Sequence, residues 1–349
     1  MDTSEKRCKM IDTLFPNGIP SLWCPMLVHY DSAGRLDHSH IERHISTMCR
    51  KIHTFLLFGS TGDGWELRDT EKEELLLFCI KLAETYHFQM LIGVLEPERK
   101  ASASKIKDWI AWLRRYTGCA EDEKALQQAH ICGFTVCAPR GASLSQSEIV
   151  EDLREVLNIG VPTAIYQLPQ ITLNEIEPET VCLLADEYSN FYLFKDTSGT
   201  DRVILSGLDF QKVFFVRGAE SNYDYWSTFS GGRYPGFLLS SANVFSEELS
   251  DVLSLLKQGE TDSARKLSQR ISHTVEEIFQ NTSSFPYGNV FTNSIKCMDH
   301  IFAYGKNWRE FSPPILHCGK LLPPEMLEFA AKTLETYGWN PQRGYLTSI

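Results

Sequence analysis

Short apolar runs alternate with longer segments of helical period along the chain. The runs are rich in β-branched and aromatic residues and show little polar alternation, which is typical of parallel strands covered on both faces. They lie at 21–27, 54–59, 89–95, 134–139, 162–169, 191–197, 212–218 and 234–243. Eight such runs, most of them followed by a helical segment, predict an α/β fold of the (β/α)₈ TIM-barrel type.

Two of the intervening segments have clear helix signals. The segment 145–157 opens with Ser145 and carries Glu148 three residues later, which is a capping-box spacing. The segment 69–86 offers Asp69 or Thr70 as a cap. It places five apolar residues on one face, namely Leu75, Leu76, Cys79, Leu82 and Ala83.

The pattern also predicts how the chain is divided. We expect an N-terminal extension at 1–17, the barrel at 18–258 and a C-terminal helical appendage at 259–349. Within the barrel, 100–132 resembles two helices broken at Thr117-Gly118, where one helix would suffice, and is interpreted as an insertion or an extended third helix. From 245 to 336 the pattern is helical, with interruptions at NTSSFPYGN and EFSPPILHCGKLLPP.

Composition narrows the possible partners. Of the 349 residues, 43% are hydrophobic and 23% charged, as in ordinary globular proteins, and the formal net charge is −11 with no dense basic patch. A nucleic-acid partner is therefore not expected. The ten cysteines form no C-x-x-C pair, the N-terminus has no apolar leader and no segment is long enough to span a membrane. We expect a cytoplasmic protein without a membrane partner.

The stretch Gly59-Ser60-Thr61-Gly62-Asp63 ends the second apolar run, where a barrel enzyme places its active site. Small residues let the backbone approach a ligand, and successive N–H groups with two hydroxyls can bind a carboxylate. The alternative is a simple tight turn.

Lys195 ends the strongly apolar sixth run. Burying a charged amine is costly, and an uncharged amine is what a Schiff-base nucleophile requires. The alternative is a lysine that extends to solvent or pairs with Asp196.

Tyr166 ends the preceding run. Its phenol could carry protons to and from a substrate at Lys195. The alternative is a packed aromatic side chain with a solvated hydroxyl.

These stretches resemble, in order, the signatures of the dihydrodipicolinate synthase / N-acetylneuraminate lyase family. They are GSTGD before a helix that opens with acidic residues, Y-x-x-P-x-x-T from Tyr166, and K-D-x-S-G from Lys195. The similarity continues through GAESNYDYWSTFSGGRYPGFLLSSAN, where Gly218 begins a segment like the family's G-x-D, and runs weakly to Lys296 and SPPIL. It covers most of 18–320.

The resemblance implies a class I aldolase or lyase without metal or cofactor. Lys195 would form an imine with pyruvate or a related 2-oxo acid, Tyr166 would transfer protons, and Ser60 and Thr61 beside Gly59 would hold the substrate carboxylate. Gly218 would line the substrate site. The family is commonly tetrameric, so a homo-oligomer, either a dimer or a tetramer, is expected.

Two departures separate this chain from the best-known members. The family's synthases have an arginine for the second substrate's carboxylate where this chain has Ile171. Many members have a Pro-Tyr-Tyr segment after the fourth strand, where this chain reads Ala138-Pro139-Arg140-Gly141. Arg140 is therefore a candidate for an anion contact. Asp63 replaces the more usual glutamate, which is a mild change.

Three alternatives remain beside a carbon–carbon lyase acting on a 2-keto-3-deoxy acid. A dehydratase or hydratase would use the same enamine chemistry. A barrel that binds a keto acid as a sensor would not need an imine. A barrel enzyme of unrelated chemistry would require three ordered coincidences.

A metal site is not expected from the histidines. His40 and His44 share a helical face near His38, yet the spacing HIERH lacks the glutamate of a metalloprotease motif and no third ligand is evident. A solvated start of a helix is the simpler interpretation.

Overall fold

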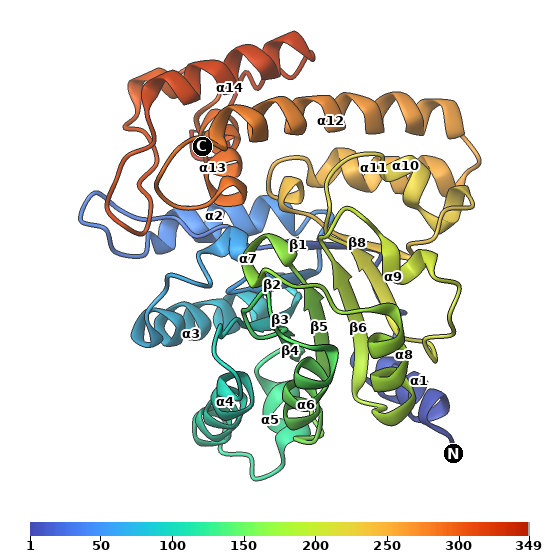
Figure 1. Ribbon diagram of the computed structural model, residues 1–349. Coiled ribbons are helices and arrows are strands. Elements are labelled where there is room, and N and C mark those ends of the chain that lie inside the picture. The colour runs from blue at the N-terminus through green and yellow to red at the C-terminus, as the bar shows by residue number, and fades with distance from the viewer. Residues whose placement is uncertain (348–349) are drawn as a thin grey trace. The chain divides into compact units, whose positions relative to one another are not determined.

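The eight apolar runs form eight parallel strands, and the strand order β1 to β8 closes into a barrel, as predicted. The computed structural model describes residues 1–347, and Figure 1 labels the elements. The strands are β1 (Leu22–Pro25), β2 (Thr54–Leu57), β3 (Gln89–Val94), β4 (Ile131–Cys137), β5 (Thr163–Gln167), β6 (Phe191–Asp196), β7 (Phe214–Arg217) and β8 (Gly236–Leu238).

Most strands end earlier than the apolar runs, because the last residues of a run leave the ladder and enter the following loop. The end of the eighth run, for example, is a 3₁₀ turn, η3 (Ser240–Asn243). The predicted start of the fourth strand was wrong. β4 begins at Ile131, inside the expected insertion, where an irregularity in its pairing with β3 lies between Met90 and Leu91.

Backbone contacts divide the chain into two compact units, which are described separately. Unit 1 comprises 1–23, 89–219 and 233–238, and unit 2 comprises 24–88, 220–232 and 239–349. The expected division into extension, barrel and appendage stays a prediction.

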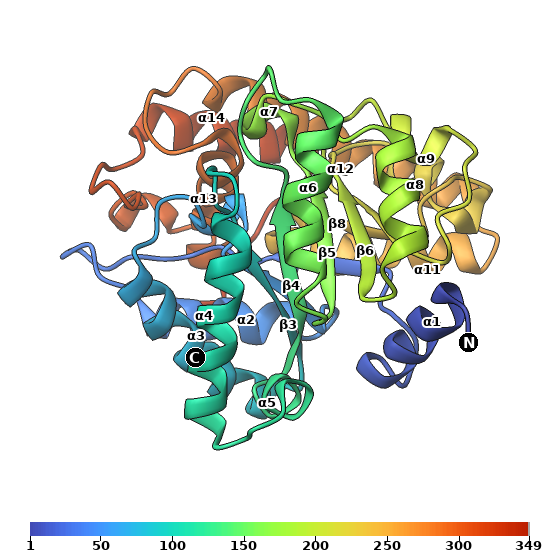
Figure 2. The ribbon, with the colours of Figure 1, turned by 60° about the horizontal axis from the view of Figure 1, so that its bottom comes forward.

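Unit 1 holds strands β3 to β8 and the helices outside them. In Figure 2, α4, α6 and α8 stand side by side along these strands. The break predicted at Thr117-Gly118 is confirmed, because Gly118 ends α4 in a left-handed conformation. The helices are α1 (Thr3–Leu14), α4 (Ala101–Thr117), α5 (Asp122–Gln128), α6 (Gln146–Leu157), α7 (Pro169–Thr172), α8 (Pro178–Glu187) and α9 (Arg202–Leu205).

The first helix is attached to unit 1 by one buried arginine. α1 packs against α8 and β6, and its Arg7 is fully buried. The Arg7 guanidinium donates to Phe191 O at 2.6 Å, to Ala185 O at 2.6 Å, to Tyr188 O at 2.7 Å and also to Gln211 O. Burial lowers the pKa of Arg7 to about 10. The guanidinium thus supplies buried donors to carbonyls of α8, of the start of β6 and of the segment before β7.

Unit 2 holds β2 and most of the C-terminal half. Figure 1 shows α12 running alongside α11 and α14, and α13 also packs against α12 and α14. Its elements are α2 (His38–Met48), η1 (Ser60–Gly62), α3 (Asp69–Tyr86), α10 (Tyr223–Trp226), η2 (Thr228–Ser230), η3, α11 (Ser246–Lys257), α12 (Thr261–Thr282), α13 (Val290–Tyr304), η4 (Trp308–Glu310) and α14 (Pro324–Thr336).

The predicted helix signals are confirmed, with one correction. Ser145 caps α6 and forms the expected reciprocal pair with Glu148. The caps proposed for α3 were wrong by at least one residue, because Arg68 is still extended and forms the N-cap, and its N–H donates to Glu71 Oε2 at 2.8 Å. The apolar face proposed for α3 is buried.

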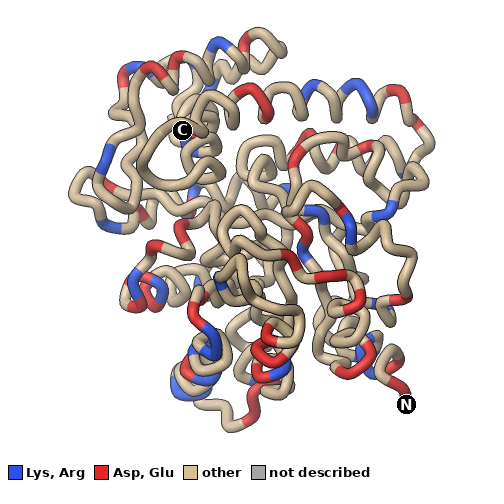
Figure 3. Tube along the Cα trace, in the orientation of Figure 1, with Lys and Arg blue, Asp and Glu red and all other residues tan. Residues whose placement is uncertain are grey.

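Charged residues of both signs are interspersed along the trace (Figure 3), and several form exposed ion pairs such as Arg154–Glu187 and Arg309–Glu328. All ten cysteines are free thiols. Among residues 1–347, no helix combines the length and hydropathy that a membrane crossing requires.

Candidate active site

Lys195 and Tyr166 lie together in unit 1 because they are paired residues on adjacent strands. Tyr166 of β5 is in register with Lys195 of β6. Partners in register on neighbouring strands project to the same side of the sheet. The Lys195 Nζ lies 4.0 Å from the centroid of the Tyr166 ring, and both side chains are buried, with exposed fractions of 5% and 2%. The sheet thus holds an amine against a phenol ring in a largely water-free environment.

Gly218 follows β7 and packs against the Lys195 side chain. Its N–H donates to Asp196 O at 2.6 Å. A Cβ added at this position would lie 2.8 Å from Lys195 Cε and 2.3 Å from Thr197 Oγ1, so no larger residue fits without displacing them. Gly218 therefore shapes the space around the lysine, which the family resemblance had indicated only as lining the site.

We expect Gly218→Ala to disturb the lysine directly. The added methyl group would force Lys195 or Thr197 out of place, at a cost of about 1–3 kcal/mol typical of overpacking. The rate at which a 2-oxo acid is trapped on Lys195 by borohydride should fall by roughly tenfold or more. A variant that traps as fast as the wild type would show that the lysine tolerates this contact.

A buried polar network holds the loop after the sixth-strand lysine, and sequence reasoning missed it. Arg217 donates to both oxygens of Asp201, at 2.9 and 3.0 Å. Tyr234 donates to Asp201 Oδ1 at 2.8 Å and contacts Asp196 Oδ2 at 3.4 Å, while Ser198 donates to Asp196 Oδ1. Burial raises the pKa of Asp196. An arginine ending the apolar run of β7 was the available signal, but its partners come from separate loops.

One hydroxyl near the lysine has no protein partner. Thr197 Oγ1 is buried and has no hydrogen bond to any residue in the described part of the chain. An unsatisfied buried hydroxyl is costly unless a ligand or water completes it. Thr197 is thus a candidate contact for a polar substrate atom.

The turn Gly59-Ser60-Thr61, here called the GST turn, lies in unit 2 and is held by residues at the start of α13. Asn289 Nδ2 donates to Ser60 O at 3.0 Å, and Thr292 Oγ1 donates to Ser60 O and Thr61 O at 3.1 Å. The Thr61 and Ser240 hydroxyls share a hydrogen bond of 2.7 Å. With both carbonyls held, the backbone of the turn is fixed.

Close backbone contacts explain why glycine is required at two positions in and just after this turn. A Cβ at Gly62 would lie 2.3 Å from Met26 O, and one at Gly64 would lie 1.8 Å from Phe58 O. Ser60 and Thr61 are both buried, and their amide N–H groups bond to no other described residue. Two unpaired N–H groups in succession form a concavity of the kind that accepts an anion.

Asp63 and Lys296, both buried, form an ion pair in unit 2. Their Nζ–Oδ2 distance is 3.7 Å, and the Tyr30 hydroxyl donates to the same Asp63 oxygen at 2.8 Å. Lys296 also donates to Ile315 O at 2.9 Å. Desolvation lowers the pKa of Lys296, which makes it the second buried lysine to consider as a nucleophile.

Arg140 has an exposed side chain that makes no ion pair or side-chain hydrogen bond with the described residues. Its backbone N–H donates to Pro97 O at 2.9 Å, and Gly141 N–H donates to Thr172 O at 2.9 Å. The structure fixes the backbone of this segment and does not bring the guanidinium to Lys195 or Tyr166.

Comparisons with known proteins identify the family to which the chain is similar. The sequence model of the dihydrodipicolinate synthetase family matches residues 121–299. A 4-hydroxy-tetrahydrodipicolinate synthase of Methanococcus maripaludis is 24% identical over 265 residues, which cover 75% of this chain and 84% of that enzyme. The enzyme of the same name from Nitratiruptor is 23% identical over 129 residues, covering 37% of this chain and 43% of that enzyme.

A solved structure shares the fold. YagE from E. coli, described as a prophage protein of the dihydrodipicolinic acid synthase family in complex with pyruvate, superposes with a TM-score of 0.68. The two sequences are 18% identical, and the match covers 91% of this chain and 98% of that one.

The fold is a closed parallel barrel, the class of fold that carries its active site at the C-terminal ends of the strands, and the buried Lys195 lies one residue before the end of the sixth strand. Within this class, the chain belongs to the dihydrodipicolinate synthetase family. It is therefore an enzyme of the class I aldolase and lyase type, which acts through a Schiff base.

Proposed function

We propose that Lys195 forms an imine with pyruvate or a related 2-oxo acid, and that the enzyme cleaves or forms a carbon–carbon bond through the resulting enamine. The observation that carries the proposal is the buried contact of Lys195 Nζ with the Tyr166 ring in a member of this family. The uncharged amine adds to the keto carbon, and water leaves to give the imine. Loss of a proton, or of an aldehyde, from the neighbouring carbon then gives the enamine.

Tyr166, Ser60 and Thr61 are proposed to complete the reaction. Tyr166 transfers protons to and from the substrate or the carbinolamine. The two unpaired N–H groups of the GST turn, with its hydroxyls, bind the carboxylate beside Gly59. The steric fit of Gly218 against Lys195 and the unpaired Thr197 hydroxyl support a substrate bound beside the lysine. Arg140 remains a candidate for the far end of a long anionic substrate.

The substrate is proposed to be a 2-keto-3-deoxy acid. It would differ from the two substrates of the family's synthases, the second of which carries its own carboxylate. Ile171 lies on α7, where the family's synthases have an arginine, so this position supplies no charge for a second carboxylate. Incubation with such acids distinguishes the reactions. Release of pyruvate and an aldehyde indicates a lyase, whereas loss of water alone indicates the dehydratase alternative.

Borohydride trapping tests the imine. Wild-type protein is treated with pyruvate and borohydride and analysed by intact mass and peptide mapping. One reduced pyruvate on the peptide containing Lys195 is expected. An adduct on Lys296 would overturn the residue assignment, and no adduct with pyruvate or longer 2-oxo acids would leave a barrel that binds keto acids without imine chemistry.

Tyr166→Phe is expected to separate imine formation from proton transfer. The substitution keeps the buried ring but removes the hydroxyl, so exchange of the pyruvate methyl protons in D₂O should slow by about 10²-fold or more, as is typical of losing a general acid–base group. Proton NMR measures the exchange without an aldehyde partner, and trapping on Lys195 should still occur, though more slowly, because the carbinolamine loses a proton donor. Unchanged exchange would assign the proton transfer to another group.

We also propose a homo-oligomeric assembly and a cytoplasmic location. Membership of the family supports a homo-oligomer, either a dimer or a tetramer, which light scattering after size exclusion measures directly. Ten free thiols support a reducing, cytoplasmic environment.

A further inference from the structure

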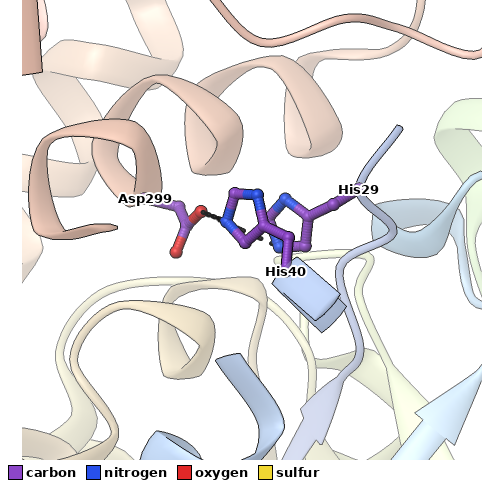
Figure 4. Close-up of side chains that lie close together, drawn as sticks. All are labelled: His29, His40 and Asp299. Carbon is purple, nitrogen blue, oxygen red and sulfur yellow. Dashed lines mark ion pairs between the residues drawn. The ribbon is translucent and has the colours of Figure 1, made fainter. Parts of the chain in front are cut away.

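We propose that His29, His40 and Asp299 form a binding site in unit 2 for one divalent metal ion of the zinc class. The three residues come from separate elements, namely the loop after β1, the helix α2 and the helix α13. Figure 4 shows both imidazole rings turned toward the Asp299 carboxylate.

The distances are close to those of a metal site. His29 Nε2 lies 3.8 Å and His40 Nε2 lies 3.6 Å from the same oxygen, Asp299 Oδ2, and one donor atom from each of the three residues lies within 4.8 Å of the others. Donor atoms around a tetrahedral zinc ion are roughly 3.3 Å apart, given bonds of about 2.0–2.1 Å. Small side-chain rotations would therefore close the site around an ion.

The donors select the class of ion. Two imidazole nitrogens and one carboxylate suit zinc, cobalt or nickel, whereas calcium and magnesium prefer sites made only of oxygen. The rings of His29 and His40 are stacked, with centroids 3.6 Å apart and planes inclined by 11°. This arrangement puts both Nε2 atoms on the same side, facing one carboxylate oxygen.

The surrounding residues orient the ligands. The Tyr345 hydroxyl donates to Asp299 Oδ1 at 2.8 Å, which leaves Oδ2 toward the two histidines. His44 Nε2 must donate to Asn243 O at 2.8 Å, because a carbonyl only accepts. A neutral His44 then accepts at Nδ1 from His29 Nε2 at 3.0 Å, and His40 Nε2 donates to the Tyr345 hydroxyl at 2.9 Å, so a metal ion would replace both hydrogen bonds. Such outer contacts are typical of built metal sites.

A cavity provides access to the ligands. It has a volume of about 340 Å³, and its lining includes His29, His40 and Asp299 together with Lys296 and Tyr304. His40 has an exposed side-chain fraction of 15%, while Asp299 is at 3%. An ion can therefore reach a carboxylate that is itself almost fully buried.

Binding of zinc itself tests the proposed site. Chelator-treated full-length protein is titrated with ZnCl₂ by calorimetry, and one ion per chain is expected. Because the ion binds only the folded arrangement, saturating zinc should raise the melting temperature by roughly 3–6 °C. Cobalt should give the visible absorption of a four-coordinate ion, and X-ray absorption of the zinc-loaded protein should show two imidazoles and no sulfur.

The variants His40→Gln and Asp299→Asn should weaken zinc binding by about 100-fold or more, since each removes a ligand. His53→Gln and Cys318→Ser, which alter an exposed histidine and an exposed thiol, are the matched controls and should bind zinc as the wild type does. The absence of one tight zinc per wild-type chain overturns the site. So does sulfur in the X-ray absorption spectrum, or unchanged affinity in a folded His40→Gln protein. If the variants do not fold, the spectrum of the wild type decides.

Discussion

Lys195→Ala and Lys195→Arg are expected to lose borohydride-trapped pyruvate completely and to lower exchange of the pyruvate methyl protons by roughly a thousandfold or more. Losses of this size are typical when the nucleophile of a concerted catalytic unit is removed. Alanine removes the amine that forms the imine. Arginine keeps a long basic side chain, but its guanidinium stays protonated and cannot add to a carbonyl.

The environment of the lysine explains why no other lysine should substitute for it. Lys195 Nζ lies over the Tyr166 ring, whereas Lys296, which is also buried, is bonded to Ile315 O and paired with Asp63. The exposed Lys212 is a suitable control, and Lys212→Ala should trap and exchange as the wild type does. Residual trapping in folded Lys195→Ala would move the imine elsewhere and contradict the proposed mechanism.

Arg7→Met is expected to destabilise the protein by about 3–5 kcal/mol. Methionine fills a similar volume, yet it donates no hydrogen bond, so the carbonyls of Phe191, Ala185 and Tyr188 would remain buried without their donor. Unsatisfied buried acceptors cost about 1–3 kcal/mol each before the structure relaxes. The free energy of unfolding in urea, with the thermal midpoint, measures the loss.

Two further substitutions on the same helix test the cause. Arg7→Lys keeps the charge with a single nitrogen, so we expect an intermediate loss. Lys6→Ala alters an exposed neighbour and should change stability by no more than about 0.5 kcal/mol. If Arg7→Met matched Lys6→Ala, the arginine would not be the attachment of α1.

The sequence alone determined the barrel and the pair at its candidate site. Eight apolar runs predicted eight parallel strands because a strand buried on both faces needs continuous apolar residues, and that signal is local. The pairing of Tyr166 with Lys195 could be anticipated for the same reason, since consecutive parallel strands in a barrel are neighbours and each residue lies one position before the end of its strand. The capping pair Ser145 and Glu148 is also a local feature.

Only the tertiary structure decided the features built from distant segments. α1 is held by carbonyls between 178 and 204 positions further along the chain, and the sequence of this helix does not indicate these partners. The sequence did not reveal a third ligand to accompany His40, because Asp299 lies on α13, far along the chain from α2. Contacts between segments far apart in the chain follow no fixed sequence spacing and cannot be predicted from it, whereas strands and helix caps depend on neighbouring residues.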